Sequence, residues 1–479
     1  MARYETDNRE TLQFFSGSLD DLLPPDSVAR AIWAGLQKLD FGAFDDGYDN
    51  DAVGRPAVDP RSLTAVWTLG LLRGVTSSLR VVALCERDIE FRWLLGDVGV
   101  EKSTLCAFRK EHKAELAALG AQVLSALGGK GLLPGKHMGV DGTIVRAAAS
   151  RHASRSRRRL EKNRQYLQGI LEEKLSQMDE GAESAELQAL QHRQARVDAA
   201  LAELDAQGKP ESEAKITVTE PEARVRKQKD GSFAPGYNAQ AVMDLDSGVM
   251  VSAEIVDTGN DTGELQPQVT QAQAVLDALP CEPPRVIESI TADSGYHETL
   301  QLHALEAQEV RCYVPGDRNT HRQAPGIGPG FQVAEFTYDE TRDVMICPMG
   351  RDLKRRGLNP KKTSAVYQGS YGTCQACPAK PQCCPGIKSD RCVSRPLPLY
   401  KETLERVANR LDTDEGRRKC HARWVTNEGV FARLNGLLHW KRNRMWHRAG
   451  AEMELLWRQF AHNLMLLTGI WKPLISATP

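Results

Sequence analysis

A short apolar segment with an acid inside it constrains the fold most strongly. Residues 137–146 read HMGVDGTIVR, which predicts a buried strand that carries Asp141. Residues 150–212 are different, because they are long, polar and helical in pattern, with two leucine-rich stripes separated by a turn. This segment predicts a helical hairpin, similar to a coiled coil, that interrupts the core between its first two strands.

The segments that follow predict a mixed α/β sheet. A turn at residues 246–248 joins two strand-like runs, and Pro280 ends the helix behind them. The expected elements are strands at 237–244, 249–256, 289–295 and 311–314, with helices at 264–279 and 299–306. Residues 55–133 are helical in pattern, which suits either a helix-turn-helix-like module or a plain helical bundle. Residues 315–400 are rich in loops and cysteine, and the chain becomes helical again from residue 400 to about 471.

Composition excludes several classes of protein. The chain has 479 residues, of which 41% are hydrophobic and 26% charged, so it is not a wholly disordered chain. Its formal net charge is −1, which excludes a uniformly basic coat but leaves room for local basic faces. No signal peptide is readable at the N-terminus, and residues 455–475 are too polar to span a membrane, so we expect a cytoplasmic protein.

Three acids are candidates for chemistry. Asp141 lies within a predicted core strand and Asp293 lies at the end of another. A carboxylate in an apolar strand is costly unless it is paired or binds a metal ion, and oxygen-rich sites suit Mg²⁺ or Mn²⁺. Glu428 lies on a predicted helix and borders the apolar stripe that begins at Phe431. The spacing of the three acids in the sequence does not by itself place them in one site. Each acid taken singly is more simply interpreted as a capping or surface residue.

Cysteines gather in one part of the chain. Six of the eleven fall between residues 347 and 392, which in a reducing compartment is more typical of a metal site than of disulfides. The pattern predicts a closed structural zinc site with four thiolate ligands, Cys347, Cys374, Cys377 and Cys383. Cys384 and Cys392 are spare candidates, so the fourth ligand stays open, and a set of free thiols is the alternative.

Positive charge gathers near the C-terminus. Residues 417–448 hold nine Lys or Arg against one acid, Glu428, with aromatic side chains interleaved. This concentration in a neutral chain favours a phosphate-binding surface on which aromatics stack on bases, over a solvated helix face with core tryptophans. The predicted DNA-binding residues are Arg423, Arg433, Lys441, Arg442, Arg444, Arg448 and Trp440, together with Arg109 of the N-terminal helices.

With these residues in hand, the sequence resembles the DDE transposases of bacterial insertion sequences, which have an RNase H-like catalytic core. The resemblance runs from about residue 55 to 467 and is carried, in order, by the segments RPAVDPRSL, VDGTIVRA, PGYNAQAVMD, ITADSGYHE, CQACPAKPQC and EGRRKCHARWVTNEGVFARLN. Two positions depart from the family pattern, since Cys420 replaces a usual tyrosine and Asn435 a frequent lysine.

The resemblance implies a site and a reaction. It places the catalytic roles on Asp141, Asp293 and Glu428, which would hold two Mg²⁺ or Mn²⁺ ions. The reaction would be in-line attack on a DNA phosphodiester, first to cleave at an element end and then to transfer the strand. The expected partners are the terminal inverted repeats and target DNA, and two ends brought together imply a homodimer. We expect action at the bacterial nucleoid.

The resemblance also implies an organisation. The expected parts are an N-terminal arm (1–50), a helical DNA-binding domain (51–133), an RNase H-like core (134–149 and 213–314), a helical hairpin insertion (150–212), a zinc-binding insertion (315–399) and a C-terminal helical part of the core (400–479). The hairpin would serve either dimerisation or DNA contact. Two other functions fit the same sequence: a metal-dependent nuclease without strand transfer, and a retired transposase kept as a zinc-containing DNA-binding regulator.

Overall fold

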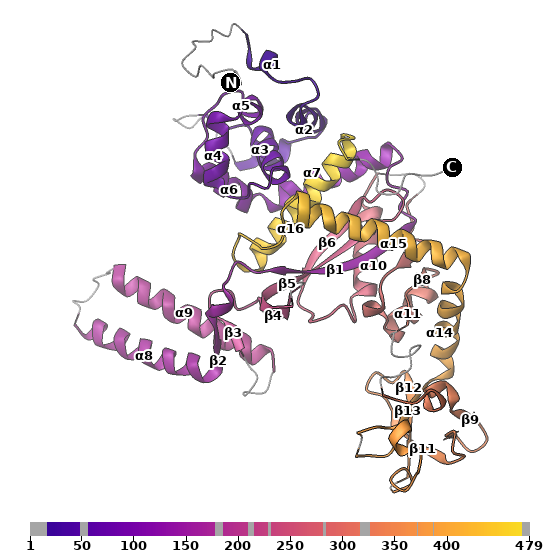
Figure 1. Cartoon of the computed structure of the whole chain (residues 1–479). Helices are drawn as coiled ribbons and strands as arrows, with labels where there is room; N and C mark the ends of the chain where they lie inside the picture. Colours follow the sequence, from indigo (N-terminus) through magenta and orange to yellow (C-terminus); the bar gives the residue numbers. More distant parts are fainter. Residues whose placement is uncertain are drawn as a thin grey trace, which may run out of the picture.

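A computed structural model describes residues 17–47, 56–177, 185–208, 215–228, 231–280, 284–316, 326–370, 372–386 and 388–471. Figure 1 shows a central sheet with a helical group at one end, a two-helix arm on one side and a small β-rich region beyond the other. Among these residues, no helix combines the length and the apolar character that crossing a bilayer requires.

The N-terminal group is entirely helical. Its elements are α1 (Leu19–Leu22), α2 (Val28–Leu36), the 3₁₀ turn η1 (Gly42–Gly47), α3 (Pro60–Leu72), α4 (Ser78–Arg87), α5 (Ile89–Leu95), α6 (Lys102–Glu111) and α7 (Lys113–Gly129). Asp59 begins α3 as expected, because its side chain accepts a hydrogen bond from the Arg61 amide and Pro60 takes the first helical position. Residues 17–47 do not form a separate arm, since Ile32, Leu36 and Phe44 are buried in the same core as the later helices.

The central sheet has the order β4-β5-β1-β7-β8, with β6 also paired to β5. Its strands are β1 (His137–Arg146), β4 (Arg224–Lys227), β5 (Phe233–Asp244), β6 (Met250–Val256), β7 (Ser289–Thr291) and β8 (Arg311–Tyr313). β1 runs antiparallel to β5 but parallel to β7, and β7 runs parallel to β8. The predicted mixed α/β sheet is therefore confirmed, with β7 shorter than expected, so that Asp293 lies just past its end.

Helices pack on this sheet from distant parts of the chain. They are α10 (Leu265–Asp277), α11 (Thr299–Ala307), α14 (Pro398–Leu411), α15 (Asp414–Ala432) and α16 (His447–Leu467). α15 contacts β1, whereas α16 lies between β6 and α7 and joins the sheet to the N-terminal helices (Figure 1). α16 is buried on almost every side, and its Glu454 and Arg458 form an ion pair of 3.0 Å within the core.

The predicted helical hairpin forms an arm. It consists of η2 (Arg151–Ala153), β2 (Ser154–Ser156), α8 (Arg157–Ser176), α9 (Ala185–Ala206) and β3 (Lys215–Thr217). β2 pairs with β3 at the base, and α8 packs on α9 through a small core of its own, in which Leu160, Leu167 and Leu201 are buried. Figure 1 shows the two helices extending away from the sheet.

The cysteine-rich region is more regular than its sequence predicts. It forms an antiparallel sheet of order β13-β12-β11-β10-β9 rather than a series of loops. The elements are η4 (Pro329–Phe331), η5 (Val333–Glu335), β9 (Thr337–Asp339), β10 (Val344–Ile346), β11 (Asp352–Leu358), β12 (Ser364–Gly369), α13 (Lys380–Cys383) and β13 (Cys392–Pro396). Its core includes Phe336, Leu353 and Tyr367. The strands were missed because three of the five have five residues or fewer and because β11 carries exposed Lys and Arg.

Candidate active site

Two predicted acids meet because two parallel strands are neighbours. Gly139 of β1 pairs with Thr291 of β7, and Asp141 and Asp293 each follow two residues beyond this rung. Residues two apart on a strand share a face, so the register brings both carboxylates to one place at the sheet. Asp293 also begins the 3₁₀ turn η3 (Ser294–Tyr296), where its Oδ1 accepts a hydrogen bond of 2.8 Å from the Gly295 amide.

Asp141 is half-buried and its pKa is perturbed. Burial raises the pKa of the Asp141 carboxyl to about 6, and the charges of Asp293 and Asp261 add to this increase. The guanidinium of Arg423 opposes it, with Nη1 lying 3.6 Å from Asp141 Oδ2. A carboxyl whose pKa is raised toward neutral by burial and by like charges is typical of a functional site.

The helix α15 covers the same face of β1. Arg423 approaches Asp141, and one turn later Asn427 lies over Gly139, where an added Cβ would stand 2.6 Å from Asn427 Oδ1. The neighbouring hydroxyl of Thr426 donates a hydrogen bond of 3.1 Å to the Leu245 carbonyl, which fixes the helix on the sheet. A side chain at position 139 would therefore displace the Asn427 amide from its place on the strand.

Glu428 follows Asn427 on α15, but its side chain is exposed. The structure thus puts the helix of Glu428 on the face of Asp141, without burying the glutamate between helix and sheet. Among the described residues, no group of three or more His, Cys, Asp or Glu side chains is arranged to hold one metal ion.

A fourth acid, Asp261, was missed by the sequence analysis. Its Oδ1 accepts a hydrogen bond of 2.7 Å from Gln240 and lies 2.9 Å from where a Cβ of Gly142 would be. Gly142 and Asp141 are consecutive, so Asp261 stands on the opposite face of β1. Tyr296 also hydrogen-bonds Gln240, and its pKa is raised well above the ordinary value by burial and by the charges of Asp261, Asp141 and Asp293. Asp261 lies in a turn-rich loop, which gives no strand pattern to mark it.

Two predicted DNA contacts, Arg109 and Trp440, have side chains that pack into the core. Arg109 is 5% exposed, stacks on the Trp67 ring at 4.6 Å and lies 3.7 Å from Glu454, so it joins α6 to α16. Trp440 is fully buried and donates a hydrogen bond of 2.8 Å from Nε1 to Asn443. Trp440 therefore offers no surface to a base, whereas Arg109 still lines a pocket together with Lys110 and Arg444.

Other cations of the basic segment have partners within the protein. Arg448 bonds Asp257, Glu452 and the Ile255 carbonyl. Arg442 donates to the carbonyls of Ala147 and Ala148, and Arg433 is half-buried with its guanidinium 5.2 Å from the Trp471 ring. The side chains of Lys441 and Arg444 are exposed. The count of charges along the segment therefore overstates the charge that is open to a ligand.

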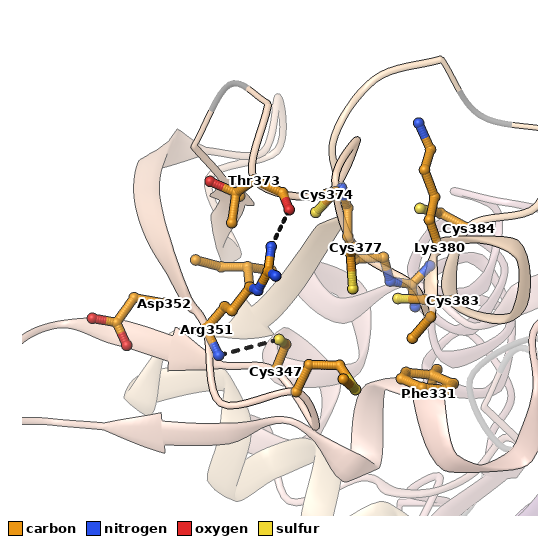
Figure 2. A pocket seen from close by; sticks show the side chains of 15 residues that line it. Phe331, Cys347, Arg351, Asp352, Thr373, Cys374, Cys377, Lys380, Cys383 and Cys384 are labelled. Carbon is orange, nitrogen blue, oxygen red and sulfur yellow. Dashed lines mark hydrogen bonds between the residues drawn. The ribbon is translucent and has the colours of Figure 1, made fainter.

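Five cysteines line one cavity of the β-rich region, Cys347, Cys374, Cys377, Cys383 and Cys384 (Figure 2). The Sγ atom of Cys347 accepts a hydrogen bond of 3.4 Å from the Arg351 amide, and that of Cys374 accepts one of 3.4 Å from the Arg391 amide. Burial raises the pKa of the Cys374 thiol, and it raises that of Cys383 to about 11. The four predicted ligands and Cys384 thus line the same cavity, but no three of them in the described structure are arranged to hold one metal ion.

Comparison with known families identifies two parts of the chain. A transposase domain of the DUF772 family matches residues 17–111, which are the N-terminal helices. A transposase DDE domain matches residues 346–468, which include the cysteines, α15 and the whole of α16. Searches of curated proteins and of solved structures found no match. The chain is a DDE transposase of the insertion-sequence type. Its DDE domain is that of enzymes that cleave DNA and transfer the strand with divalent metal ions.

Proposed function

We propose that the central sheet is an RNase H-like core in which Asp141, Asp293 and Glu428 carry the phosphodiester chemistry. One observation supports this most directly: β1 and β7 are adjacent and parallel, and they hold Asp141 and Asp293 two residues beyond the same rung. The order β5-β1-β7-β8, in which only β5 runs antiparallel to β1, is the arrangement expected of such a core. Glu428 completes the set from α15, which packs on the face of Asp141.

The carboxylates suit divalent ions. Asp141, Asp293 and Glu428 offer hard oxygen donors, and the half-buried carboxyl of Asp141 lies 3.6 Å from the guanidinium of Arg423. Two Mg²⁺ or Mn²⁺ ions bound there would stabilise the attacking and the leaving oxygens of an in-line displacement. The raised pKa of Asp141 means that this side chain must lose its proton before it can serve as a ligand.

The residues around the aspartates position the substrate. Arg423 presents a guanidinium beside Asp141, where it balances the carboxylate and offers donors to a DNA phosphate. The attacking group is water at the element end and then the freed 3′-hydroxyl at the target. No residue of the protein becomes covalently attached to DNA, so neither the cysteines nor the tyrosines need act as nucleophiles.

The remaining parts have supporting roles in this proposal. The N-terminal helices recognise the terminal inverted repeats, and a homodimer brings the two ends together at the nucleoid. Cys347, Cys374, Cys377 and Cys383 hold a structural zinc ion, which is supported by their shared cavity and by the amide hydrogen bonds to two of the sulfurs. Because burial raises the pKa of Cys374 and Cys383, a metal ion must displace protons there.

The test is cleavage of a labelled duplex that carries the flanking element end, with Mg²⁺ or Mn²⁺. The wild type is compared with Glu428→Gln and, as a matched control on the same helix, Glu415→Gln, whose side chain accepts a hydrogen bond from Tyr313. We expect cleavage to be lost in the first variant and kept in the second. Equal cleavage by wild type and Glu428→Gln would remove this glutamate from the site. If Asp261→Asn lost cleavage while Glu428→Gln kept it, the catalytic role proposed for Glu428 would belong to Asp261.

A further inference from the structure

The helical arm carries a groove of unusual charge. The groove runs between the base of α8 and the facing part of α9, and its lining is Ala153, Arg155, Arg159, Leu160, Asn163, Arg193, Arg196, Val197, Val218 and Thr219. Four of these ten residues are arginines, and the described lining includes no Asp or Glu. The sequence analysis noted the arm but left open whether it serves dimerisation or DNA contact.

Three of the four groove arginines are not engaged by the described protein. Arg159, Arg193 and Arg196 are exposed, and within the described residues their side chains make no hydrogen bond or ion pair. Arg155 is held in place by hydrogen bonds from its Nη1 to the carbonyls of His152 (2.6 Å) and Ser154 (2.9 Å). Neutral donors stand beside these cations, since Asn163 and Thr219 line the same groove and the hydroxyl of Thr219 is buried with no partner in the described structure.

Three other cations, two on the arm and one at its base, are paired with acids. Arg157 is paired with Asp205 and lies 3.8 Å from Glu161, and Lys174 lies 2.7 Å from Glu186. At the base of the arm, Arg224 lies 2.7 Å from Glu203. The arm therefore has acids available, and it places them away from the groove. Like charges kept together without acids repel one another, and a polyanion relieves that repulsion.

The position of the arm leaves the groove accessible. α8 and α9 pack on each other and on the short strands β2 and β3 at their base, while β3 leads to β4 at the edge of the central sheet. In Figure 1 both helices extend from the sheet with no other element laid across them. A long body can therefore lie along the groove and continue toward the core.

We propose that this arginine groove, formed by Arg155, Arg159, Arg193 and Arg196, binds the sugar-phosphate backbone of duplex DNA. The guanidinium fork matches a phosphate through two parallel hydrogen bonds, and four such groups without acids fit a chain of phosphates better than a single anion. The inference rests on the proposed function, and it adds a second, sequence-independent DNA contact on the insertion, outside the N-terminal helices and the active site.

The experiment measures DNA binding by the full chain as a function of salt. The triple variant Arg159→Gln, Arg193→Gln and Arg196→Gln is compared with wild type and with Arg157→Gln, whose charge is already balanced by Asp205 and Glu161. The probes are a fluorescent duplex carrying the element end and a scrambled duplex of equal length. We expect the triple variant to bind both duplexes about tenfold or more weakly at 0.1 M salt, with the salt slope reduced by about 3, because each lost phosphate contact removes about one unit. We expect Arg157→Gln to behave like wild type.

The alternatives give different results. Unchanged affinity and slope in the triple variant would overturn the arginine groove while leaving the proposed function intact, provided that wild type cleaves the element-end duplex. A loss confined to the element-end duplex would overturn the backbone contact in favour of sequence-specific recognition. A shift from dimer to monomer with unchanged DNA binding would make the groove a contact between two copies of the chain. Absence of DNA binding by wild type would overturn the proposed function together with this inference.

Discussion

Two regions of this transposase collect charge of opposite sign, and they do so in different ways. At the sheet, Asp141 and Asp293 are brought together by strand pairing between segments 150 residues apart in sequence, and burial raises the pKa of Asp141 to about 6. In the arginine groove, the charges come from neighbouring turns of one hairpin and remain exposed. The first arrangement costs folding energy, whereas the second costs little, because water solvates an exposed guanidinium.

The comparison separates two kinds of functional charge. A buried carboxylate that resists ionisation is held in place by the rest of the fold, so its removal alters both chemistry and stability. An exposed arginine without a partner contributes to binding alone. The basic segment near the C-terminus mixes both environments, with Trp440 in the core and Arg444 at the surface.

The largest expected effect falls on catalysis. Asp141→Asn and Asp293→Asn remove oxygen ligands for the divalent ions, and we expect cleavage to slow by on the order of 10³-fold or more, because several kcal/mol of transition-state stabilisation is lost. The triple variant of the arginine groove, assayed at saturating protein, is expected to cleave within about twofold of wild type. Single-turnover cleavage rates measure both. An equal loss of cleavage rate in the aspartate variants and in the triple arginine variant would contradict the distinction between the two regions.

The next effect falls on stability in the C-terminal segment. Trp440 is fully buried whereas Trp424 is 54% exposed, although both stand in the same basic stretch. We expect Trp440→Ala to lower the free energy of unfolding by about 3–5 kcal/mol and Trp424→Ala to change it by about 0.5 kcal/mol or less. Chemical unfolding of both variants checks this. A small effect at Trp440 would restore it as a candidate for base stacking.

A third prediction concerns the cost of the buried aspartate. The pKa of Asp141 is raised in the folded protein from 3.8 to about 6, so the folded state binds more protons than the unfolded state between these values. Stability therefore falls as pH rises through this window. At pH 7, in buffer free of divalent ions, Asp141→Asn is expected to raise the free energy of unfolding by about 3 kcal/mol.

Thermal unfolding of wild type and Asp141→Asn across pH 3.5 to 7.5 provides the measurement. The two curves are expected to converge below about pH 4, where the carboxyl is protonated in both states. A variant that is less stable than wild type at pH 7 would show that Arg423 stabilises the carboxylate more than burial destabilises it.

The smallest effect is expected on the arm. Arg159→Gln removes an exposed charge without a partner in the described structure, so the free energy of unfolding is expected to change by about 0.5 kcal/mol or less. Arg157→Gln breaks surface ion pairs and is expected to cost up to about 1 kcal/mol. If the groove arginines stabilised the arm through contacts of their own, Arg159→Gln would lower the free energy of unfolding more than Arg157→Gln.

Local patterns were sufficient to predict much of the fold. The apolar runs of β1 and β6, the turn between β5 and β6 and the stripes of α8 and α9 each follow from periodicity that a neighbouring element does not alter. The same is true of Asp141, because an acid inside an apolar strand is conspicuous in any context. Its proximity to Asp293 was expected from family resemblance, and the register of β1 and β7 supplies the physical reason.

Contacts between distant segments set the limit of prediction. Arg109 was assigned to DNA as part of a helix-turn-helix-like module and Trp440 as an aromatic in a basic segment, but Glu454 of α16 and Asn443 give them partners that no local pattern reveals. Asp261 was overlooked because its importance depends on Gln240 of another strand. The strands of the cysteine-rich region were missed for a related reason, since short strands with charged outer faces resemble loops.

The most direct test of the account is a donor–target joining assay with the full chain. A labelled duplex with a free 3′-hydroxyl at the element end is incubated with target DNA and Mg²⁺ or Mn²⁺, and joined products are counted for wild type and Asp293→Asn. We predict joined product from wild type and none from the variant. Cleavage without joining by wild type would make the protein a nuclease, and equal joining by both proteins would contradict the assignment of Asp293 to the active site.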